Sequence, residues 1–467
     1  MREKFLMIFW VIISLLFLGT ASQSYCQPNE YFFSNFSSGI GARALGMGKA
    51  YLAVSDDSSA SSWNPAGLAS LSRPEFSISF SYNNLKANIP DYAYSSPQIG
   101  YTINYRVSEI NSKSIGKYFN FLSFAFPFRI KGKNIVAQIS YQRKIPFSAT
   151  EEYDYKFEYQ SRYQYDYDYR YKAEGSGGFD IISVSAASEI LTGLRLGVSI
   201  NRWFNGYSLP TEEVYLYSLA NYYGLTEDWE DRATDSLEFK ISGYNISIGL
   251  MYKIVGRVNL GLVYRSPFQG DIDYSNKADY WDGYNESHQS STYSSEGKIV
   301  FPSSFGAGIA LQVSDNLLVS FGYMKTFWSK GKIKDYARVN SDGGIPSSED
   351  FLYPTMKIPD LYEQLNTQQY SLGGEYMMKK EFITVPLRAG IFYDFQYSLD
   401  IENNQKKYWG VSVGSGIRWK NLSLDLAMVN YFGKYKYAHD LDQIYSGETR
   451  NVTSYFLIFH SSLSYKF

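Results

Sequence analysis

A two-residue period of apolar side chains is the feature that most constrains this chain, because it recurs from residue 76 to the last residue. Side chains two positions apart share one face of a β-strand, so this pattern gives each strand an apolar face and a polar face. In the final segment the apolar positions are Tyr455, Leu457, Phe459, Leu463, Tyr465 and Phe467, and the polar ones are Ser454, His460, Ser462, Ser464 and Lys466. The same alternation occurs in residues 76–82, 194–200, 244–252, 258–264, 305–313, 409–419 and 422–428. Segments of about 10 to 15 residues can cross a membrane as tilted strands, with their polar residues facing a wet lumen.

The connections between these segments alternate in length. Short turns are expected at residues 130–133, 190–193, 254–257, 314–316, 379–381 and 420–421, and long polar connections at 147–178, 206–237, 267–297, 329–366, 397–406 and 433–452. Short periplasmic turns and long extracellular loops are typical of outer-membrane barrels. The sequence therefore predicts an all-β fold, a transmembrane antiparallel β-barrel of about 14 strands over residues 75–467. Residues 85–116 leave the first pair of strands open, because they hold both a loop and a further alternating segment (QIGYTINYRV).

A soluble two-sheet sandwich is the alternative fold, since its hairpins would alternate in the same way. A sandwich needs a dry interior face, so this chain would have to bury dozens of Ser, Asn, Lys and Arg residues or expose as many Tyr, Leu and Phe residues. The barrel is therefore favoured.

The first residues have the character of a secretory signal. After Arg2 and Lys4, residues 5–19 carry no charge, and a polar stretch (TASQSYCQ) follows. This run is shorter than the roughly 20 residues of a membrane-spanning helix and no second long apolar run follows, which excludes a helical membrane protein. Residues 1–26 are predicted to be a signal peptide, cleaved after Ser24 or after Cys26. A lipoprotein anchored at Cys26 is the less favoured reading, because the bulky Tyr25 precedes it.

Composition narrows the location and the partners. The net charge is −2 and only 19% of the residues are charged, which does not supply the basic field that nucleic acid requires. Aromatic residues make up 18% of the chain, which suits a wall with lipid on one side and water on the other. We therefore expect an exported protein of the bacterial outer membrane, surrounded by membrane lipid and lipopolysaccharide.

Residues 39–74 break the alternation and are rich in Gly, Ala and Ser. A barrel of about fourteen strands is too wide for its own side chains to fill, so it needs an open pore or a plug. The Asn64-Pro65 pair begins a turn that Ala66-Gly67 completes, and the glycines of GIGARALGMG permit close packing of the backbone. We therefore predict that residues 27–74 form an N-terminal plug, or hatch, inside the lumen.

This segment resembles the long-chain fatty-acid transporter family of outer-membrane proteins (FadL type). The resemblance rests on SSGIGARALGMGKAYLAVSDDSSASSWNPAGLASLSRPEF, with weaker similarity at FPSSFGAGIALQV, YMKTFW, VPLRAGIFYD and the last strand, so it covers essentially the whole mature chain. It implies a fourteen-stranded barrel closed by a hatch, an apolar binding pocket and a kinked strand that opens toward the membrane.

The resemblance also implies roles for particular residues. Asn64, Pro65 and Ala66, together with Gly67, would belong to the hatch that holds the channel shut. An aromatic residue near the N-terminus would reach into the ligand pocket, and the candidates are Tyr31, Phe32, Phe33 and Phe36. The last strand, with Tyr465 and Phe467, resembles the signal that the barrel assembly machinery recognises.

Two motifs carry more than one interpretation. Asp56 and Asp57 could form a gate that pairs with a basic group on the barrel wall, or a solvated turn or helix cap before Ser58 and Ser59. Within the hatch, Arg43 and Arg73 are plausible partners for these carboxylates. The tyrosine-rich residues 151–172 could be an external stacking platform, but a hairpin that extends the barrel wall above the membrane is favoured.

No residue set for catalysis or for coupling to an energy source is visible. The sequence holds three histidines, His288, His439 and His460, and contains no Gly-x-Ser-x-Gly element, metal-ligand spacing or phosphate-binding loop. We therefore expect no enzymatic activity, no cofactor and no metal. The predicted function is a channel for passive uptake of hydrophobic small molecules such as long-chain fatty acids, similar lipids or hydrocarbons.

The competing function is a non-enzymatic shuttle or docking barrel of a type IX-like secretion system, whose hatch looks similar. The lumen should discriminate between the two functions. A continuous apolar pocket favours transport, whereas a filled lumen below a broad apolar loop surface favours docking.

Overall fold

The fold was analysed in a computed structural model. The structure describes residues 39–467 except 90–91, 99–100, 109, 147–148, 161–163, 223–224, 255, 331, 335–338, 341–364, 401 and 438–449. In this part of the chain no helix is long and apolar enough to cross a membrane.

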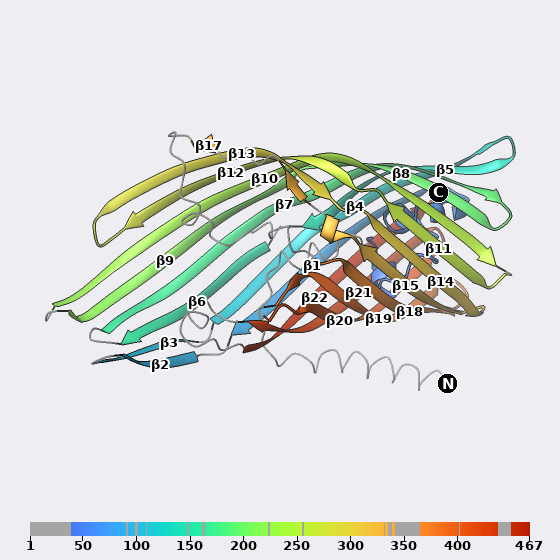
Figure 1. The fold of residues 1–467 in the computed structure, drawn as a ribbon. Coiled ribbons are helices and arrows are strands. Elements are labelled where there is room, and N and C mark those ends of the chain that lie inside the picture. Colours follow the sequence, from blue (N-terminus) through green and yellow to red (C-terminus); the bar gives the residue numbers. More distant parts are fainter. Residues whose placement is uncertain are drawn as a thin grey trace, which may run out of the picture.

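Within the described residues, fourteen antiparallel strands close into a barrel, as predicted (Figure 1). In their order around the ring they are β1 (Glu75–Ile89), β4 (Ile110–Ile130), β5 (Lys133–Pro146), β7 (Gln164–Leu191), β8 (Leu194–Phe204), β10 (Leu225–Ile254), β11 (Val258–Arg265), β14 (Ser304–Ser314), β15 (Leu317–Thr326), β18 (Thr367–Lys379), β19 (Thr384–Leu399), β20 (Gln405–Trp419), β21 (Leu422–Tyr437) and β22 (Arg450–Lys466). The ring closes where β22 pairs with β1, from Glu75 opposite Lys466 to Lys86 opposite Tyr455. Closure leaves no free sheet edge in the membrane, where unpaired backbone groups would be costly.

The alternation of the strands sorts apolar side chains outward and small polar ones inward. Val184, Ile200 and Leu426 are 59%, 55% and 52% exposed on the outside, where lipid would cover them. Ser185 and Ser199 are buried in the lumen, and their hydroxyl groups are hydrogen-bonded at 2.7 Å. This arrangement is the reverse of a soluble fold and matches a wall between lipid and a polar lumen.

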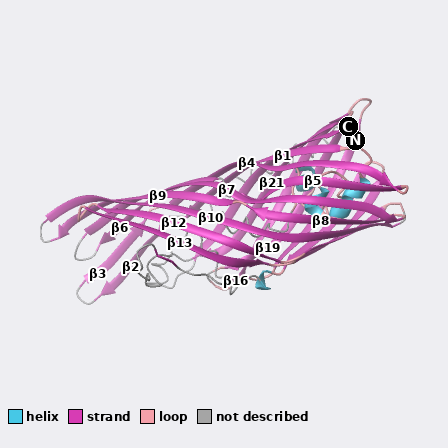
Figure 2. Cartoon of the chain, turned by 90° about the horizontal axis from the view of Figure 1, so that it is seen from above, coloured by secondary structure: helices cyan, strands magenta, loops and turns pink. Residues whose placement is uncertain are grey.

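Three of the predicted long polar connections, at residues 147–178, 206–237 and 267–297, consist largely of strands in the described part of the chain, which corrects part of the sequence interpretation. Beyond the ring, β6 (Ala149–Gln160), β9 (Gly206–Tyr222) and β12 (Phe268–Asp282) pair with the long ends of β7 and β10. The hairpin β2 (Tyr92–Gln98)–β3 (Tyr101–Val107) pairs with β6 through β3, and β13 (Ser287–Phe301) pairs with β12. The short strands β16 (Lys332–Lys334) and β17 (Val339–Asn340) pair with β13. We call this sheet the extension; it projects far beyond one end of the barrel (Figures 1 and 2). The many polar residues of these segments indicate loops, but the extension has a partly buried face, which includes Tyr169, Tyr171 and Ile272.

Two earlier uncertainties are resolved by the pairing. The alternating segment within residues 85–116 forms the hairpin β2–β3, which belongs to the extension and not to the ring. The tyrosine-rich residues 151–172 form the predicted hairpin, in which Tyr155 pairs with Tyr169 and Phe157 with Tyr167. Their rings contact one another, at 4.8 Å and 4.9 Å between centroids.

The remaining elements are short helices. Residues 39–74 contain α3 (Ala42–Gly46), α4 (Ala60–Trp63) and the 3-10 helix η1 (Pro65–Ser70), and η2 (Trp328–Lys330) follows β15. The three N-terminal helices lie inside the barrel near its short-turn end (Figure 2), so the predicted plug is present in the lumen. We refer to residues 39–74 as the hatch.

Candidate functional site: the hatch and the lumen above it

The Asn64-Pro65-Ala66 element ties the hatch both to itself and to the wall. Asn64 is the N-cap of η1, and its side-chain oxygen accepts a hydrogen bond from the Ala66 N–H at 3.2 Å. Pro65 occupies the first turn, where the missing N–H has no partner to lose. The Asn64 side-chain amide donates to the carbonyl of Leu52 at 3.0 Å and to that of Leu250, on β10, at 3.2 Å. All of these hatch residues are buried.

At Gly67, the last residue of the predicted hatch motif, the neighbouring backbone leaves no room for a side chain. A Cβ at this position would lie 2.0 Å from the carbonyl oxygen of Ser55. The backbone N–H of Gly67 donates to the carbonyl of Asn64 at 3.0 Å. The turn therefore folds back on an earlier part of the hatch, which a residue with a side chain would prevent.

Glycines of the wall make room for the backbone of the hatch. We call them the glycine belt: Gly197 (β8), Gly249 (β10), Gly261 (β11), Gly308 (β14), Gly322 (β15), Gly373 (β18), Gly390 (β19) and Gly414 (β20). A Cβ on Gly373 would lie 2.0 Å from the Met47 carbonyl oxygen, and one on Gly390 would lie 2.3 Å from the Gly48 nitrogen. Sequence reasoning missed the belt, although glycine inside a strand often marks close approach of another backbone.

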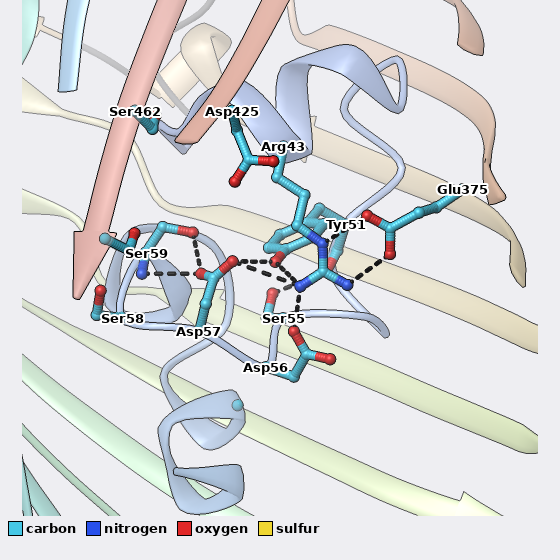
Figure 3. Close-up of polar contacts among 12 residues, drawn as sticks. Arg43, Tyr51, Ser55, Asp56, Asp57, Ser58, Ser59, Glu375, Asp425 and Ser462 are labelled. Atoms are coloured by element: carbon cyan, nitrogen blue, oxygen red, sulfur yellow. Dashed lines mark hydrogen bonds and ion pairs between the residues drawn. The ribbon is translucent and has the colours of Figure 1, made fainter. Parts of the chain in front are cut away.

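An ion-pair network joins the hatch to the wall through Arg43 (Figure 3). The Arg43 guanidinium donates two hydrogen bonds to the carboxylate of Glu375, on β18, at 2.8 Å and 2.9 Å. On its other side it pairs with Asp56 and, at 3.5 Å, with Asp57. A fork of this kind suits arginine, whose planar donors match a carboxylate in two places.

The wall continues the network beyond Glu375. Arg388, on β19, donates to Glu375 at 2.6 Å and to Asp425, on β21, at 2.7 Å. Buried charges are retained only when they are paired and hydrogen-bonded, so these partners explain how Glu375 stays ionised in the lumen. None of the three wall residues was predicted, because their pairing depends on closure of the barrel.

Asp57 takes part in a local turn of the hatch and pairs with a basic group that also lies in the hatch. Its carboxylate accepts hydrogen bonds from the Ser59 N–H at 3.0 Å, as a helix-start cap would, and from the Tyr51 hydroxyl at 2.6 Å. Burial opposes ionisation, but the charge of Arg43 and these hydrogen bonds outweigh it and hold the pKa of Asp57 below its usual value. The basic partner is Arg43 in the hatch, not a group on the wall, and the other candidate, Arg73, is exposed.

A second cation of the hatch is held by the wall. Lys49 follows Gly48, and both residues adopt the left-handed conformation (φ 67° and 61°), so the chain turns sharply after α3. The Lys49 ammonium lies 3.4 Å from a carboxylate oxygen of Asp394 and 4.6 Å above the ring of Phe392. Burial opposes its charge, but Asp394 and Tyr431 outweigh this, so the pKa of Lys49 lies above its usual value. Arg43 and Lys49 thus fix the first half of the hatch.

Arg265, at the outer end of β11, holds the second half. Its guanidinium donates to the backbone carbonyls of Ser62 at 2.9 Å and Trp63 at 3.1 Å, the last two residues of α4. No carboxylate of the described residues forms an ion pair with Arg265. Lys144, the extra residue where the β5–β7 register shifts, lies close enough for the two positive charges to repel one another. Two basic side chains therefore lie close together in the lumen above this side of the hatch.

An apolar cluster adjoins these two basic side chains. Trp203 stacks on Phe268 and Phe301 with centroids 5.0 Å and 5.8 Å apart, and Phe301 contacts Trp328 of η2 at 6.4 Å. The cluster also contains Ile145, next to Lys144, with Phe179, Ile181, Tyr207, Leu237, Phe239, Ile241, Ile272 and Ile299. We call it the lumen cluster. An apolar region beside cations is suited to a molecule with a greasy body and an anionic head.

Of the other predicted site residues, some lie outside the described part of the chain and the rest lie away from the hatch network. Tyr31, Phe32, Phe33 and Phe36 lie outside the described residues, as do Cys26, the rest of the signal segment and His439. Tyr465 and Phe467 are exposed on the outer surface, and their rings are 5.0 Å apart. His460 faces the lumen and bonds to the Ser81 hydroxyl at 2.5 Å, and His288 lies 3.6 Å from Asp279 in the extension.

A family model described as outer membrane protein transport protein (OMPP1/FadL/TodX) matches residues 34–467. The chain belongs to this family. Its members are transport channels of the bacterial outer membrane for hydrophobic molecules and are not enzymes, so the predicted location and the non-enzymatic channel function are confirmed at that level.

Solved structures of the OMPP1/FadL/TodX family have the same fold. A Pseudomonas aeruginosa FadL homologue is 14% identical, with a TM-score of 0.55, over 92% of this chain and 98% of that one. The P. putida toluene transporter TodX is 15% identical (TM-score 0.54, 92% and 99%), and the Ralstonia pickettii toluene transporter TbuX is 15% identical (TM-score 0.51, 92% and 99%). A search of curated proteins found no match.

Proposed function

We propose that this channel takes up long-chain fatty acids, or lipids with a similar long apolar body and anionic head, by passive diffusion. The observation that carries this proposal is the position of Lys144 and Arg265 beside the lumen cluster. The cluster would accept an acyl chain by burial of apolar surface, and the two cations would accept a carboxylate. Toluene, the cargo named for TodX and TbuX, has no anionic group that could bind these two side chains.

The same contacts suggest how a ligand opens the hatch. Arg265 binds the carbonyls of Ser62 and Trp63, which are neutral acceptors. A ligand carboxylate is a stronger acceptor for a guanidinium, so it would compete for these donors. We propose that this exchange weakens the hold on α4 and lets the Asn64-Pro65-Ala66-Gly67 turn move together with α3, while Asp56 and Asp57 stay paired with Arg43 inside the moving hatch.

Uptake of matched ligands tests this function. Cells that depend on this channel would be given labelled palmitate or a neutral hydrocarbon of equal length. We expect Arg265→Gln and Lys144→Gln to lower palmitate uptake several-fold and to leave the hydrocarbon unchanged. The matched control is Arg202→Gln, because Arg202 faces outward on β8 with its guanidinium 4.6 Å from the ring of Tyr244. Unchanged palmitate uptake, or an equal loss for both ligands, would refute the head-group site.

The docking role in a type IX-like system is the second candidate, and the extension favours it. Its hairpins present a broad paired surface outside the membrane, larger than a ligand entrance requires. We keep transport as the proposal because the family consists of transport channels and because two basic side chains lie beside the lumen cluster. The side chains of the lumen cluster are nevertheless packed against one another. Two cavities in the described part of the chain lie at the outer face of the barrel, one across β15 to β22 and one beside Phe80 and Phe459.

Three sequence predictions remain proposals. Residues 1–26 would be the signal peptide, so the hatch domain would begin at residue 27 and the barrel at residue 75. One of Tyr31, Phe32, Phe33 and Phe36 would enter the lumen cluster. Tyr465 and Phe467 would serve the barrel assembly machinery as its recognition signal, for which their exposed rings are available.

A further inference from the structure

Outward-facing aromatic side chains form a continuous row across six adjoining strands of the barrel. In register from β15 to β22 they are Tyr323, Tyr370, Tyr393, Trp409, Phe432 and Tyr455. Neighbouring rings contact one another, with centroids 5.1 Å apart for Tyr323 and Tyr370 and 4.4 Å apart for Tyr393 and Trp409. Aromatic girdles mark the membrane–water boundary of such barrels, and this one lies toward the extension, so it marks the outer leaflet boundary.

Two lysines stand side by side just beyond this row. Tyr408 pairs with Gly433, so Lys407 and Lys434 are the next residues outward on β20 and β21. Both share the outer face with Trp409 and Phe432, and both are exposed. Among the described residues, no carboxylate forms an ion pair with either ammonium group. Like charges facing each other across two strands repel, and an anion between them would relieve the repulsion.

Below the aromatic row the outer wall is hollowed. A groove of about 1030 Å³ extends across β15 to β22, from Lys407 and Lys434 down to Val319 and Val413. The groove exists because Gly374 pairs with Ala389, and these small outward-facing residues lie between much larger outward neighbours such as Leu372 and Ile391. The lining of the groove is mostly apolar; Ser412 and Asn430 are its polar members below the aromatic row, and the two lysines form its rim.

We propose that this groove is a specific site for a phosphorylated lipid of the outer leaflet. The phosphates bind Lys407 and Lys434, the sugar or glycerol part rests on Trp409 and Phe432, and acyl chains fill the groove over Gly374 and Ala389. The charge at the rim and the apolar floor match the two parts of such a lipid in the order in which a membrane presents them. The site lies outside the barrel and is independent of what passes through the lumen.

Lipid binding to the purified full chain tests the proposal. Delipidated protein in detergent would be mixed with bisphosphorylated lipid A and the bound lipid counted by native mass spectrometry. We expect Lys407→Gln with Lys434→Gln to weaken binding about 30-fold, the effect of two surface lysines on an anionic lipid. The matched control is Lys379→Gln with Lys380→Gln, which removes two charges at the short-turn end of the barrel, where β18 ends. This variant should bind as the wild type does.

Further arms separate head group, chain and free anion. Lipid A without its phosphates should bind the wild-type protein weakly. Its affinity should equal that of intact lipid A for the Lys407→Gln, Lys434→Gln variant. Inorganic phosphate alone should not bind. Ala389→Leu, which fills the groove without changing charge, should also lower retention of lipid A. The wild-type comparison of the two lipids holds even if a variant fails to give a heat-modifiable barrel. Equal binding of both lipids, equal binding by the lysine variant, full retention by Ala389→Leu, or tight binding of phosphate alone would each overturn the proposal.

Discussion

Arg43 shows how one side chain can hold the hatch against the barrel wall. It bridges carboxylates of the hatch and of β18. Its Nε and Nη2 donate to Glu375, and its Nη1 faces Asp56 and the Tyr51 hydroxyl. The interpretation of Asp56 and Asp57 was open in the sequence because their partner could be local or distant. Arg43 lies only 13 residues from Asp56 but 332 from Glu375, and only the first pairing could be foreseen.

Removal of Arg43 should loosen the hatch and leave the barrel intact. Arg43→Ala leaves Asp57 and Glu375 without their shared cation, and breaking a buried ion pair costs about 3 to 5 kcal/mol. The strands keep their pairing, so the heat-modifiable band should persist while protease cleaves residues 39–74. Arg73→Ala is the control, since Arg73 is exposed in the same segment. A fully protected hatch in Arg43→Ala would contradict the role given to this residue.

The Asp57 carboxylate sets the pH range in which its pairing stabilises the hatch. Its pKa in the folded protein lies below the usual value of about 3.9, so its stabilisation is complete above that pH. The contribution is lost only as pH falls through the lower, folded value. Protease protection of the hatch should therefore hold to about pH 4 and then decline less steeply in Asp57→Asn than in the wild type. A midpoint near pH 6 that Asp57→Asn abolishes would show that the pKa is raised.

At the scale of elements, the strands were predictable and their contact with the hatch was not. The alternation and the short turns defined the ring, because both are local properties of the chain. The glycine belt joins strands from β8 to β20 with one short segment, and its meaning appears only when the barrel closes around the hatch. Apart from the tyrosine-rich hairpin, the strands of the extension could not be predicted, because frequent polar residues interrupt the apolar alternation that identifies strands in a wall.

Adjacent glycines of β18 provide a test of the belt. Gly373 faces the hatch, where a Cβ would lie 2.0 Å from the Met47 carbonyl oxygen, whereas a Cβ on Gly374 would meet its nearest atom, the Leu318 carbonyl oxygen of β15, at 3.2 Å. Gly373→Ala should displace the hatch and raise single-channel conductance or antibiotic leakage. Gly374→Ala should behave as the wild type. Equal leakage from both variants would mean that the belt does not position the hatch.

At the scale of the whole molecule, the barrel and the extension use different strand pairs. β7 and β10 run through both, but each pairs with one set of neighbours in the ring and another set beyond it. Fold class, plug and family resemblance were all evident from the sequence. The lumen cluster was not, because its members come from strands, hairpins and η2 that are distant along the chain.

Shortening the extension should preserve transport. Deleting residues 153–171 and joining Glu152 to Lys172, which already pair, removes the tip of the β6–β7 hairpin without altering the register of the wall. We expect a heat-modifiable barrel with palmitate uptake within about twofold of the wild type, since no lumen residue is lost. Normal assembly with complete loss of uptake would instead assign this hairpin to the transport path, and loss of a secretion phenotype alone would favour docking.

The central claim is that the hatch must rearrange for a hydrophobic molecule to pass, and a reversible tether tests it most directly. A Cβ on Gly46, in α3, would lie 3.6 Å from the Cβ of Ala427, on β21, which is within the range for a disulfide. Cells carrying Gly46→Cys with Ala427→Cys, in a Cys26→Ser background, would be assayed for palmitate uptake before and after reduction. The account predicts low uptake when the disulfide is formed and recovery when it is reduced, with neither single variant responding. Equal uptake in the oxidised and reduced states, with the disulfide confirmed by mass spectrometry, would contradict it.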